Sequence, residues 1–178
     1  MSHSPAVALI DPVGIKAGMD HYDLLLCRGM QEAGKEVILY SNFTAAEQNV
    51  PVEQVFFNTG VAKWKAVTSN FFGHLKAFRA CKKQNIQWII VHVFRAGIFD
   101  LVTFTIARLM GLKLCTIIHD IESLDTVTVP FVRNRVLHQL PSQRVVHNDF
   151  CKTELTHQPG DKGKPITVIP HVHFRHLF

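Results

Sequence analysis

The sequence has no long uninterrupted apolar run and no recognisable leader. Its longest apolar stretches, Ile86–Phe94 and Gly97–Ala107, are too short or too interrupted to cross a bilayer. The first residues, MSHSPAVALIDP, contain a brief apolar segment with no basic segment before it, so we expect no signal peptide. We therefore expect a cytoplasmic protein, and neither a transmembrane nor a secreted one.

Cysteine is scarce, and the four cysteines stand far apart along the chain. The close pairs typical of structural zinc sites are missing among Cys27, Cys81, Cys115 and Cys151. We expect all of them to remain reduced, as is usual in the cytosol.

Acidic residues are outnumbered by basic ones, which gives a formal charge of +5 that leaves out 11 histidines. This balance permits an anionic partner, whether a phosphorylated ligand, an acidic lipid surface or nucleic acid, without choosing among them. A hydrophobic content of 47% with 19% charged residues is typical of a globular protein, and 178 residues favour a single domain.

Short apolar runs alternate with longer segments of helical periodicity along the whole chain. The expected strands are Ala6–Ile10, Val37–Tyr40, Val55–Phe57, Trp88–Phe94, Leu114–Ile118, Arg144–His147 and Ile166–Ile169. The expected helices are Tyr22–Ala33, Trp64–Lys83, Phe99–Met110, Phe131–Leu140 and Asp149–His157. Gly34 suits the C-terminal end of the first helix. Strands separated by helices in this way predict an α/β fold, a Rossmann-like parallel sheet with helices on both faces.

The helix expected from Trp64 to Lys83 has a periodic apolar stripe. This stripe consists of Val67, Phe71, Phe72, Leu75 and Phe78.

The segment KLCTIIHDIESL contains the most informative pair of polar residues. Leu114–Ile118 fits a strand buried on both faces, and it stops at His119 and Asp120. Because ligands of open α/β sheets bind beyond the carboxyl ends of the strands, this pair is a candidate site. Alternatively, His119 caps a helix or bonds to the backbone, and Asp120 is an ordinary turn residue.

An ordered series of segments resembles one known family. The segments are GIKAGMDHY, MQEAGKEVILYSNF, TIIHD, RVVHNDFCKTEL and ITVIPHVHF. Together they resemble the N-terminal, acceptor-side domain of retaining GT-B glycosyltransferases that use nucleotide-sugar donors. The resemblance implies that residues 1–170 form this domain and that residues 171–178 begin a linker to an absent C-terminal, donor-binding domain. We expect an excised domain or, alternatively, an enzyme assembled from separate chains.

For His119 the resemblance implies a catalytic role, hydrogen-bonding a hydroxyl of the donor sugar near the reacting centre, with Asp120 orienting it or the acceptor loop. Asn148 follows the strand that ends at His147, again at a carboxyl end, and is a candidate to line the cleft. Alternatively, Asn148 caps the helix that begins at Asp149.

The resemblance also implies that the first loop and the start of its helix bind substrate. Small residues at Gly14 and Gly18, around Lys16, would bring backbone amides close to a ligand, and the helix N-terminus favours a phosphate. The family has a Gly-Gly pair here, whereas Gly18 is followed by Met19. Alternatively, the two glycines only form the turn.

Asp20 and His21, next to this loop, are further candidate acceptor contacts. Asp20 is equally suited to complementing the helix dipole.

His171, His173 and His176 alternate along the last residues. We expect no metal there, because no cysteine or carboxylate joins them, and we interpret the segment as the hinge strand with His171 close to the cleft.

The function implied is transfer of a sugar from a nucleotide-sugar to a polysaccharide or a lipid-linked acceptor, with no cofactor and no nucleic acid. A basic helix face, formed by Lys76, Arg79, Lys82 and Lys83, suits peripheral contact with the inner face of a membrane. A solvated helix face is, however, the usual meaning of such a run.

The alternatives are a non-catalytic Rossmann-like module or partner subunit, and another nucleotide-dependent Rossmann enzyme. The last is disfavoured because the first loop lacks GxGxxG and Ser41 and Asn42 end the second strand. A GxSxG hydrolase motif is also missing.

Overall fold

The computed structural model describes residues 7–44, 49–119 and 129–170. The chain divides into two compact units, Met1–Val91 with Leu109–Lys113 and His92–Arg108 with Leu114–Phe178. Parallel strands run through both units in the order β3-β2-β1-β4-β5-β6-β7, a seven-stranded sheet. The Rossmann-like α/β fold predicted from the sequence is therefore confirmed.

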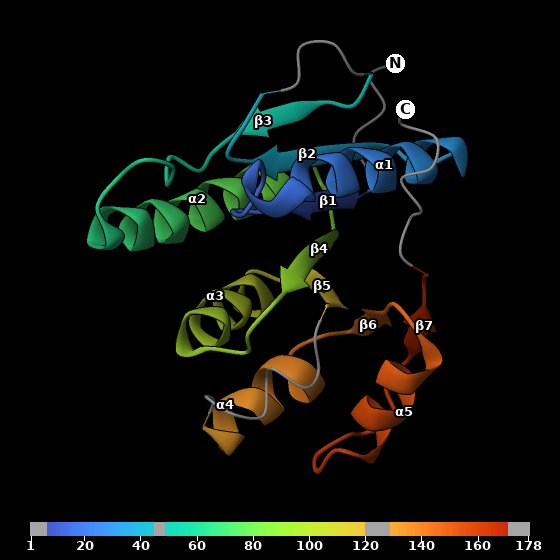
Figure 1. The fold of residues 1–178 in the computed structure, drawn as a ribbon. Coiled ribbons are helices and arrows are strands. Elements are labelled where there is room, and N and C mark those ends of the chain that lie inside the picture. The colour runs from blue at the N-terminus through green and yellow to red at the C-terminus, as the bar shows by residue number, and fades with distance from the viewer. Residues whose placement is uncertain (1–6, 45–48, 120–128, 171–178) are drawn as a thin grey trace. The chain divides into compact units, whose positions relative to one another are not determined.

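The first unit holds the strands that precede the crossover at β4 (Figure 1). They are β1 (Val7–Ile10), β2 (Val37–Ser41), β3 (Val52–Gln54) and the start of β4 (Trp88–Val93). The helices are α1 (Met19–Glu32) and α2 (Lys63–Lys83), with a short 3-10 turn, η1 (Lys16–Gly18), before α1. β1 pairs in parallel with β2 and β4, so the loop after β1 leaves a central strand.

The second unit holds β5 (Lys113–Ile118), β6 (Gln143–Val146) and β7 (Ile166–Val168). Its helices are α3 (Ile98–Leu109), α4 (Pro130–Asn134) and α5 (Asp149–His157), and α4 continues into a π-helical turn, η2 (Arg135–Gln139). β5 is buried from Leu114 to Ile118, as expected of a strand covered on both faces.

The chain leaves α1 through Gly34, the glycine that the sequence places at this helix end. Gly34 has φ 76°, and its N–H bonds to the carbonyl of Gln31 while the Lys35 N–H bonds to that of Met30. This is a Schellman ending, which requires a left-handed residue and so favours glycine.

The short strand expected at Val55–Phe57 was wrong, because the strand is three residues earlier. The half-buried Val52–Gln54 pairs with β2 at the edge, whereas Val55 and Phe56 are buried and leave the ladder. The Phe56 ring packs 5.1 Å from the ring of His74. The apolar residues Val55 and Phe56 therefore belong to a buried loop and not to the edge strand.

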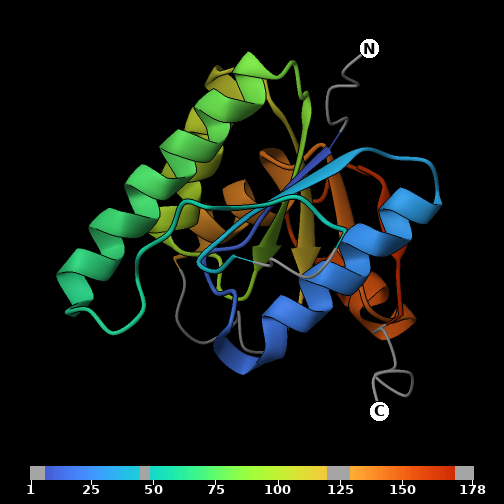
Figure 2. The same ribbon diagram turned by 90° about the horizontal axis from the view of Figure 1, so that it is seen from above.

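The apolar stripe on α2 is only partly buried. Val67 and Phe72 are exposed, and the buried face consists of Gly73, His74, Ala77, Phe78 and Cys81. Figures 1 and 2 both show the N-terminal end of α2 extending past the strands of its unit. Apolar residues near that end therefore meet no core, although their periodicity is helical.

The helix expected at Phe131–Leu140 is divided into α4 and η2. Among the described residues, no helix is both long and apolar enough to cross a membrane.

Candidate functional site

In the first unit, the loop after β1 is held by a buried carboxylate. Asp11 is fully buried, and its two oxygens accept hydrogen bonds from the backbone N–H groups of Val13 and Gly14, both at 2.8 Å. A carboxylate that accepts two amide hydrogens is stabilised in its charged form. Asp11 therefore holds the backbone at the start of this loop.

Two asparagines, Asn42 and Asn58, hold the same loop through further hydrogen bonds. Asn42 accepts from the Ile15 N–H at 3.2 Å and donates to the carbonyl of Val13 at 3.0 Å. Asn58 in turn donates to the Pro12 carbonyl at 2.7 Å and also bonds to Asn42. The loop is thus a rigid feature of the unit.

This arrangement explains why glycine stands at position 14. Gly14 has φ 51°, and a Cβ there would lie 1.8 Å from Asn42 Oδ1 and 2.8 Å from Ser41 Oγ. Gly18 also has a left-handed backbone, φ 73°, at the start of α1, but its surroundings are open. Gly14 is required by packing, and Gly18 by its conformation alone.

The loop's amide groups are mostly committed to the protein. Those of Val13, Gly14 and Ile15 bond to side chains, and that of Lys16 bonds to the Val13 carbonyl. A phosphate approaching the loop would therefore meet the exposed Lys16 side chain before these amides. Asp20 lies half-buried in the first turn of α1, and His21 is exposed.

A second buried carboxyl group, Asp23 of α1, lies next to Asp11. Burial raises the pKa of Asp23 to about 7, the hydrogen bond with Asp11 opposes the rise, and the charge of Asp20 adds to it. The two buried carboxyl groups share this hydrogen bond, so a single proton lies between them. Sequence reasoning missed both groups, since neither stands in a motif.

In the second unit, histidines gather at the carboxyl ends of neighbouring strands. His92 is near the end of β4, His119 follows β5, and His147 follows β6. His92 Nδ1 lies 2.7 Å from His119 Nε2, and the rings of His119 and His147 are 4.9 Å apart. The candidate His119 is thus one member of a cluster, and position after a strand end is what brings its members together.

The His119 ring is held on its face as well as at its edge. The Phe94 ring stacks on it at 4.6 Å with an interplanar angle of 12°, and the His119 N–H bonds to the Val93 carbonyl at 3.3 Å. One proton must lie between His92 Nδ1 and His119 Nε2, so the tautomers of the two rings are linked. Such an imidazole is an oriented hydrogen-bonding group.

The ring of His147 is oriented by a hydrogen bond to the backbone. It is buried, and its Nδ1 lies 2.9 Å from the Ile169 carbonyl, which can only accept, so Nδ1 carries the hydrogen. Among the described residues, no group of histidine, cysteine, aspartate or glutamate side chains has the arrangement of a metal site.

The remaining candidates have simpler positions. Asn148 is exposed and caps α5, accepting from the Cys151 N–H at 2.7 Å, which is the alternative role considered for it. Asp120 and His171 lie outside the described residues, as do His173 and His176.

His92 and Phe94 are the functional candidates that sequence reasoning missed in this unit. The signal was available in VHVF: alternate residues of a strand share a face, and this pair ends a strand that neighbours β5 in the sheet order. What the sequence does not give is the 2.7 Å approach of the two rings.

A comparison with solved structures places this fold with the Rossmann-like halves of GT-B glycosyltransferases. A sucrose-phosphate synthase from Thermosynechococcus elongatus aligns with a TM-score of 0.63 at 15% identity, over 92% of this chain and 47% of that one. A glycosyltransferase from Rickettsia africae aligns with a TM-score of 0.61 at 13% identity, over 92% and 42%.

A third structure is a plant enzyme, Phytolacca americana UGT2, complexed with UDP-2fluoro-glucose and pterostilbene. It has a TM-score of 0.55 at 14% identity, over 97% of this chain and 56% of that one. The chain therefore spans about half the length of these proteins. No protein-family model matches it, and no curated protein does. At these identities the likeness establishes the fold.

Proposed function

We propose that the chain is the acceptor-binding half of a retaining glycosyltransferase that takes its sugar from a nucleotide-sugar. The observation that carries the proposal is the position of His119, which follows the carboxyl end of β5 in a fold shared with glycosyltransferases. Ligands of such sheets bind beyond these strand ends. The ordered sequence motifs support the retaining, nucleotide-sugar class.

In this reaction His119 donates or accepts a hydrogen bond at a hydroxyl of the donor sugar beside the reacting carbon. The bond from that carbon to the phosphate oxygen breaks, and the acceptor oxygen bonds on the same face of the ring. The acceptor's proton passes to the leaving phosphate. Because the protein supplies no nucleophile, rate depends on how accurately the groups are positioned. The stacking of Phe94 and the bond to His92 supply that accuracy for His119.

The first loop is proposed to meet a substrate through side chains. Lys16 is exposed beside amides that are already bonded, and His21 is exposed on the following turn of helix. A cation here favours a phosphorylated group. Gly14 and Gly18 contribute by fixing the shape of the loop.

The donor-binding part is proposed to lie outside these residues, on the same polypeptide after residue 170 or on a separate chain. The support is that the chain spans only 47% of the sucrose-phosphate synthase and 42% of the Rickettsia enzyme. Sequencing the DNA downstream of codon 178 tests this directly. An open frame encoding a second Rossmann-like domain is expected, and a stop codon would leave the separate-chain form alone.

The catalytic proposal is tested in the full-length or reassembled enzyme by His119→Ala. Loss of a contact made in the transition state should lower kcat on the order of 10²-fold or more, with the fold intact. The matched control is His157→Ala at the exposed end of α5, which should leave kcat unchanged. Wild-type kinetics in a well-folded His119 variant would show that the residue is structural.

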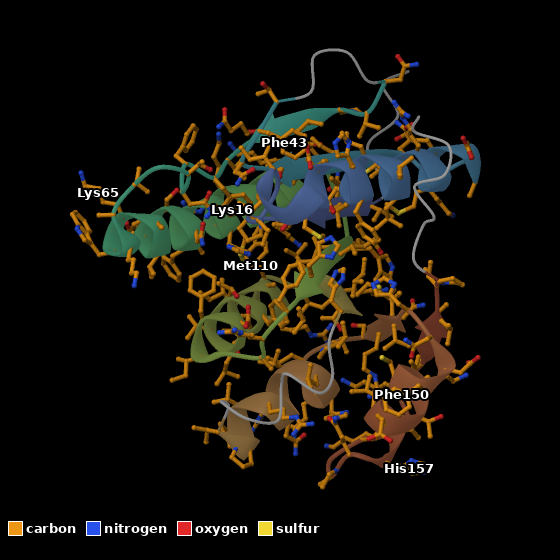
Figure 3. The ribbon with its side chains drawn as sticks, in the orientation of Figure 1. Lys16, Phe43, Lys65, Met110, Phe150 and His157 are labelled. Atoms are coloured by element: carbon orange, nitrogen blue, oxygen red, sulfur yellow. The ribbon has the colours of Figure 1, made fainter. Side chains whose placement is uncertain are left out.

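The acceptor is proposed to be a growing polysaccharide or a lipid-linked saccharide, with the chain acting at the inner face of a membrane. Support for the membrane comes from α2, where the exposed Trp64 and Phe72 accompany a row of lysines and arginine. Figure 3 shows Lys65 at the end of α2 that extends past the strands. Apolar and basic groups on one exposed helix suit an anionic lipid surface.

A further inference from the structure

A cavity of about 350 Å³ lies within the second unit, between the α4–η2 segment and the chain that follows α5. Its walls are formed by Pro130, Phe131, Arg133, Asn134, His138, Gln158 and Pro159. These elements are the lower ribbons of Figure 1. A volume of this size falls within the range of small-molecule sites.

The cavity is separate from the histidine cluster. Its polar wall is anchored to Arg144 in the first half of β6, whereas His147 follows the other end of that strand. A ligand in it would therefore not occupy the place proposed for a sugar.

The local backbone around the cavity is unusual. The Leu140 N–H bonds to the Arg135 carbonyl five residues earlier, which makes η2 a π-helical turn. Turns of this kind are rare and often occur at functional sites. This one carries His138, only 1% exposed, into the wall of the cavity.

Hydrogen bonds determine which atoms the wall presents. Arg144, which can only donate, bonds to His138 Nδ1 at 3.0 Å, so the ring's hydrogen is on Nε2. Nε2 then donates to the Gln158 Oε1 at 3.3 Å. Burial lowers the pKa of His138, which keeps the ring neutral in this arrangement. With its oxygen engaged, the Gln158 amide offers its NH₂ group to a guest.

Among the described residues that line the cavity, one carries a charged side chain. This is Arg133 with its guanidinium, and none of the described lining residues is acidic. The nearby carboxylate of Asp161 is engaged by the buried Arg144 at 2.8 Å. A negative guest could therefore form a charged hydrogen bond with the Arg133 guanidinium.

The other walls are flat and apolar. Pro130 and Pro159 present rigid rings, and Phe131 is 60% exposed with the Arg135 guanidinium 5.3 Å from its centre. A planar ring packs well against such surfaces.

We propose that this cavity binds a small anion that carries a planar ring, with the ring against Phe131 and the prolines and the anionic group toward Arg133 and Gln158. The site goes beyond the proposed sugar transfer and does not depend on it. Because the guest contacts both α4 and the chain after α5, it fastens these two segments of the second unit together.

Fluorine NMR of the chain with para-fluorobenzoate at millimolar concentration tests the proposal. We expect broadening of the fluorine signal on adding protein, and raised thermal stability. The neutral para-fluorobenzamide should bind about tenfold or more weakly, because a charged hydrogen bond is lost. Inorganic phosphate, which has no ring, should not displace the benzoate. Para-fluorophenyl phosphate tests whether a phosphate on the ring serves as well as a carboxylate.

Variants then assign the binding to this cavity. Arg133→Gln should weaken binding about tenfold or more, and Phe131→Ala should also weaken it. Lys152→Gln, an equal charge change on the exposed face of α5, should have no effect. Equal binding of benzoate and benzamide, equal loss in the Lys152 and Arg133 variants, or no binding of either ring anion to the folded chain would overturn the proposal.

Discussion

Two buried carboxyl groups determine how the first loop responds to pH. Asp11 and Asp23 are both fully buried, and Asp11 also accepts hydrogen bonds from the loop amides of Val13 and Gly14. Two like charges in hydrogen-bonding contact are strongly unfavourable away from water. The pair therefore makes the stability of the first unit depend on a single proton.

The sign of this dependence follows from the pKa of Asp23, about 7 when folded against an ordinary value of 3.8. Between these values the folded chain keeps a proton that the unfolded chain has released. The stability that this proton confers is complete below about pH 4 and is lost as the pH rises through about 7.

Asp23→Asn isolates the effect, because an amide can donate to Asp11 without titrating. We expect the wild type to lose stability relative to this variant between pH 4 and 7, by up to a few kcal/mol. Urea unfolding of both proteins across this range measures the difference. A difference that does not change with pH would show that Asp23 is ionised throughout.

At the scale of elements, α2 is placed by a glycine in its middle. A Cβ on Gly73 would lie 2.3 Å from the Phe56 ring and 2.9 Å from the Val55 carbonyl oxygen. The buried loop before α2 therefore packs directly on the helix backbone. The next residue of α2 is His74, and burial lowers its pKa to about 4, so its ring stays neutral. Its Nδ1 donates a hydrogen bond to the Asn70 carbonyl.

Gly73→Ala should destabilise the chain by about 1–3 kcal/mol, the usual cost of overpacking, despite alanine's higher helix propensity. Gly29→Ala in α1 is the matched control, since nothing lies within 4 Å of its added Cβ. That substitution should stabilise by about 0.5–1 kcal/mol. The two denaturation midpoints should move in opposite directions, and a shift in the same direction would contradict the close packing.

The proposed membrane contact is tested on the basic face of α2. Lys76 is bridged to Glu53 at 3.3 Å, which reduces its charge toward a lipid surface. If the face contacts lipid, Lys76, Arg79, Lys82 and Lys83 contribute roughly 1 kcal/mol each at most near an anionic surface. Salt should weaken binding, because exposed charges are screened over about 8 Å at physiological ionic strength.

Co-sedimentation with acidic and neutral vesicles compares the wild type with a variant in which these four residues are Gln. The control variant carries Gln at the exposed Lys35, Lys113, Lys152 and Lys162. We expect the wild type and the control to bind acidic vesicles more than the α2 variant does. Equal binding of all three, or none, would make this an ordinary solvated helix face.

For the whole molecule, the sequence predicts the parts that depend on local pattern. Alternating apolar runs and helical periods were sufficient for the parallel α/β fold, and Gly34 for a helix end. The edge strand β3 was misplaced because half-buried Val52–Gln54 looks less like a strand than the buried residues after it. His119 was found by its place after a strand, whereas its contact with His92 depends on how separate strands align.

The last prediction concerns what the chain can do alone. Similar glycosyltransferase structures are about twice as long, and we propose that the part that binds the donor lies outside these residues. Without it the reacting carbon is not positioned, and most of the rate enhancement that positioning provides is lost. Incubating the 178 residues with a panel of nucleotide-sugars and saccharide or lipid acceptors should therefore yield no product. A cooperative thermal transition must accompany that result, so that inactivity is not mistaken for unfolding. Robust turnover by the isolated chain would mean that donor and acceptor both bind here, and it would replace the half-enzyme proposal with a self-sufficient transferase.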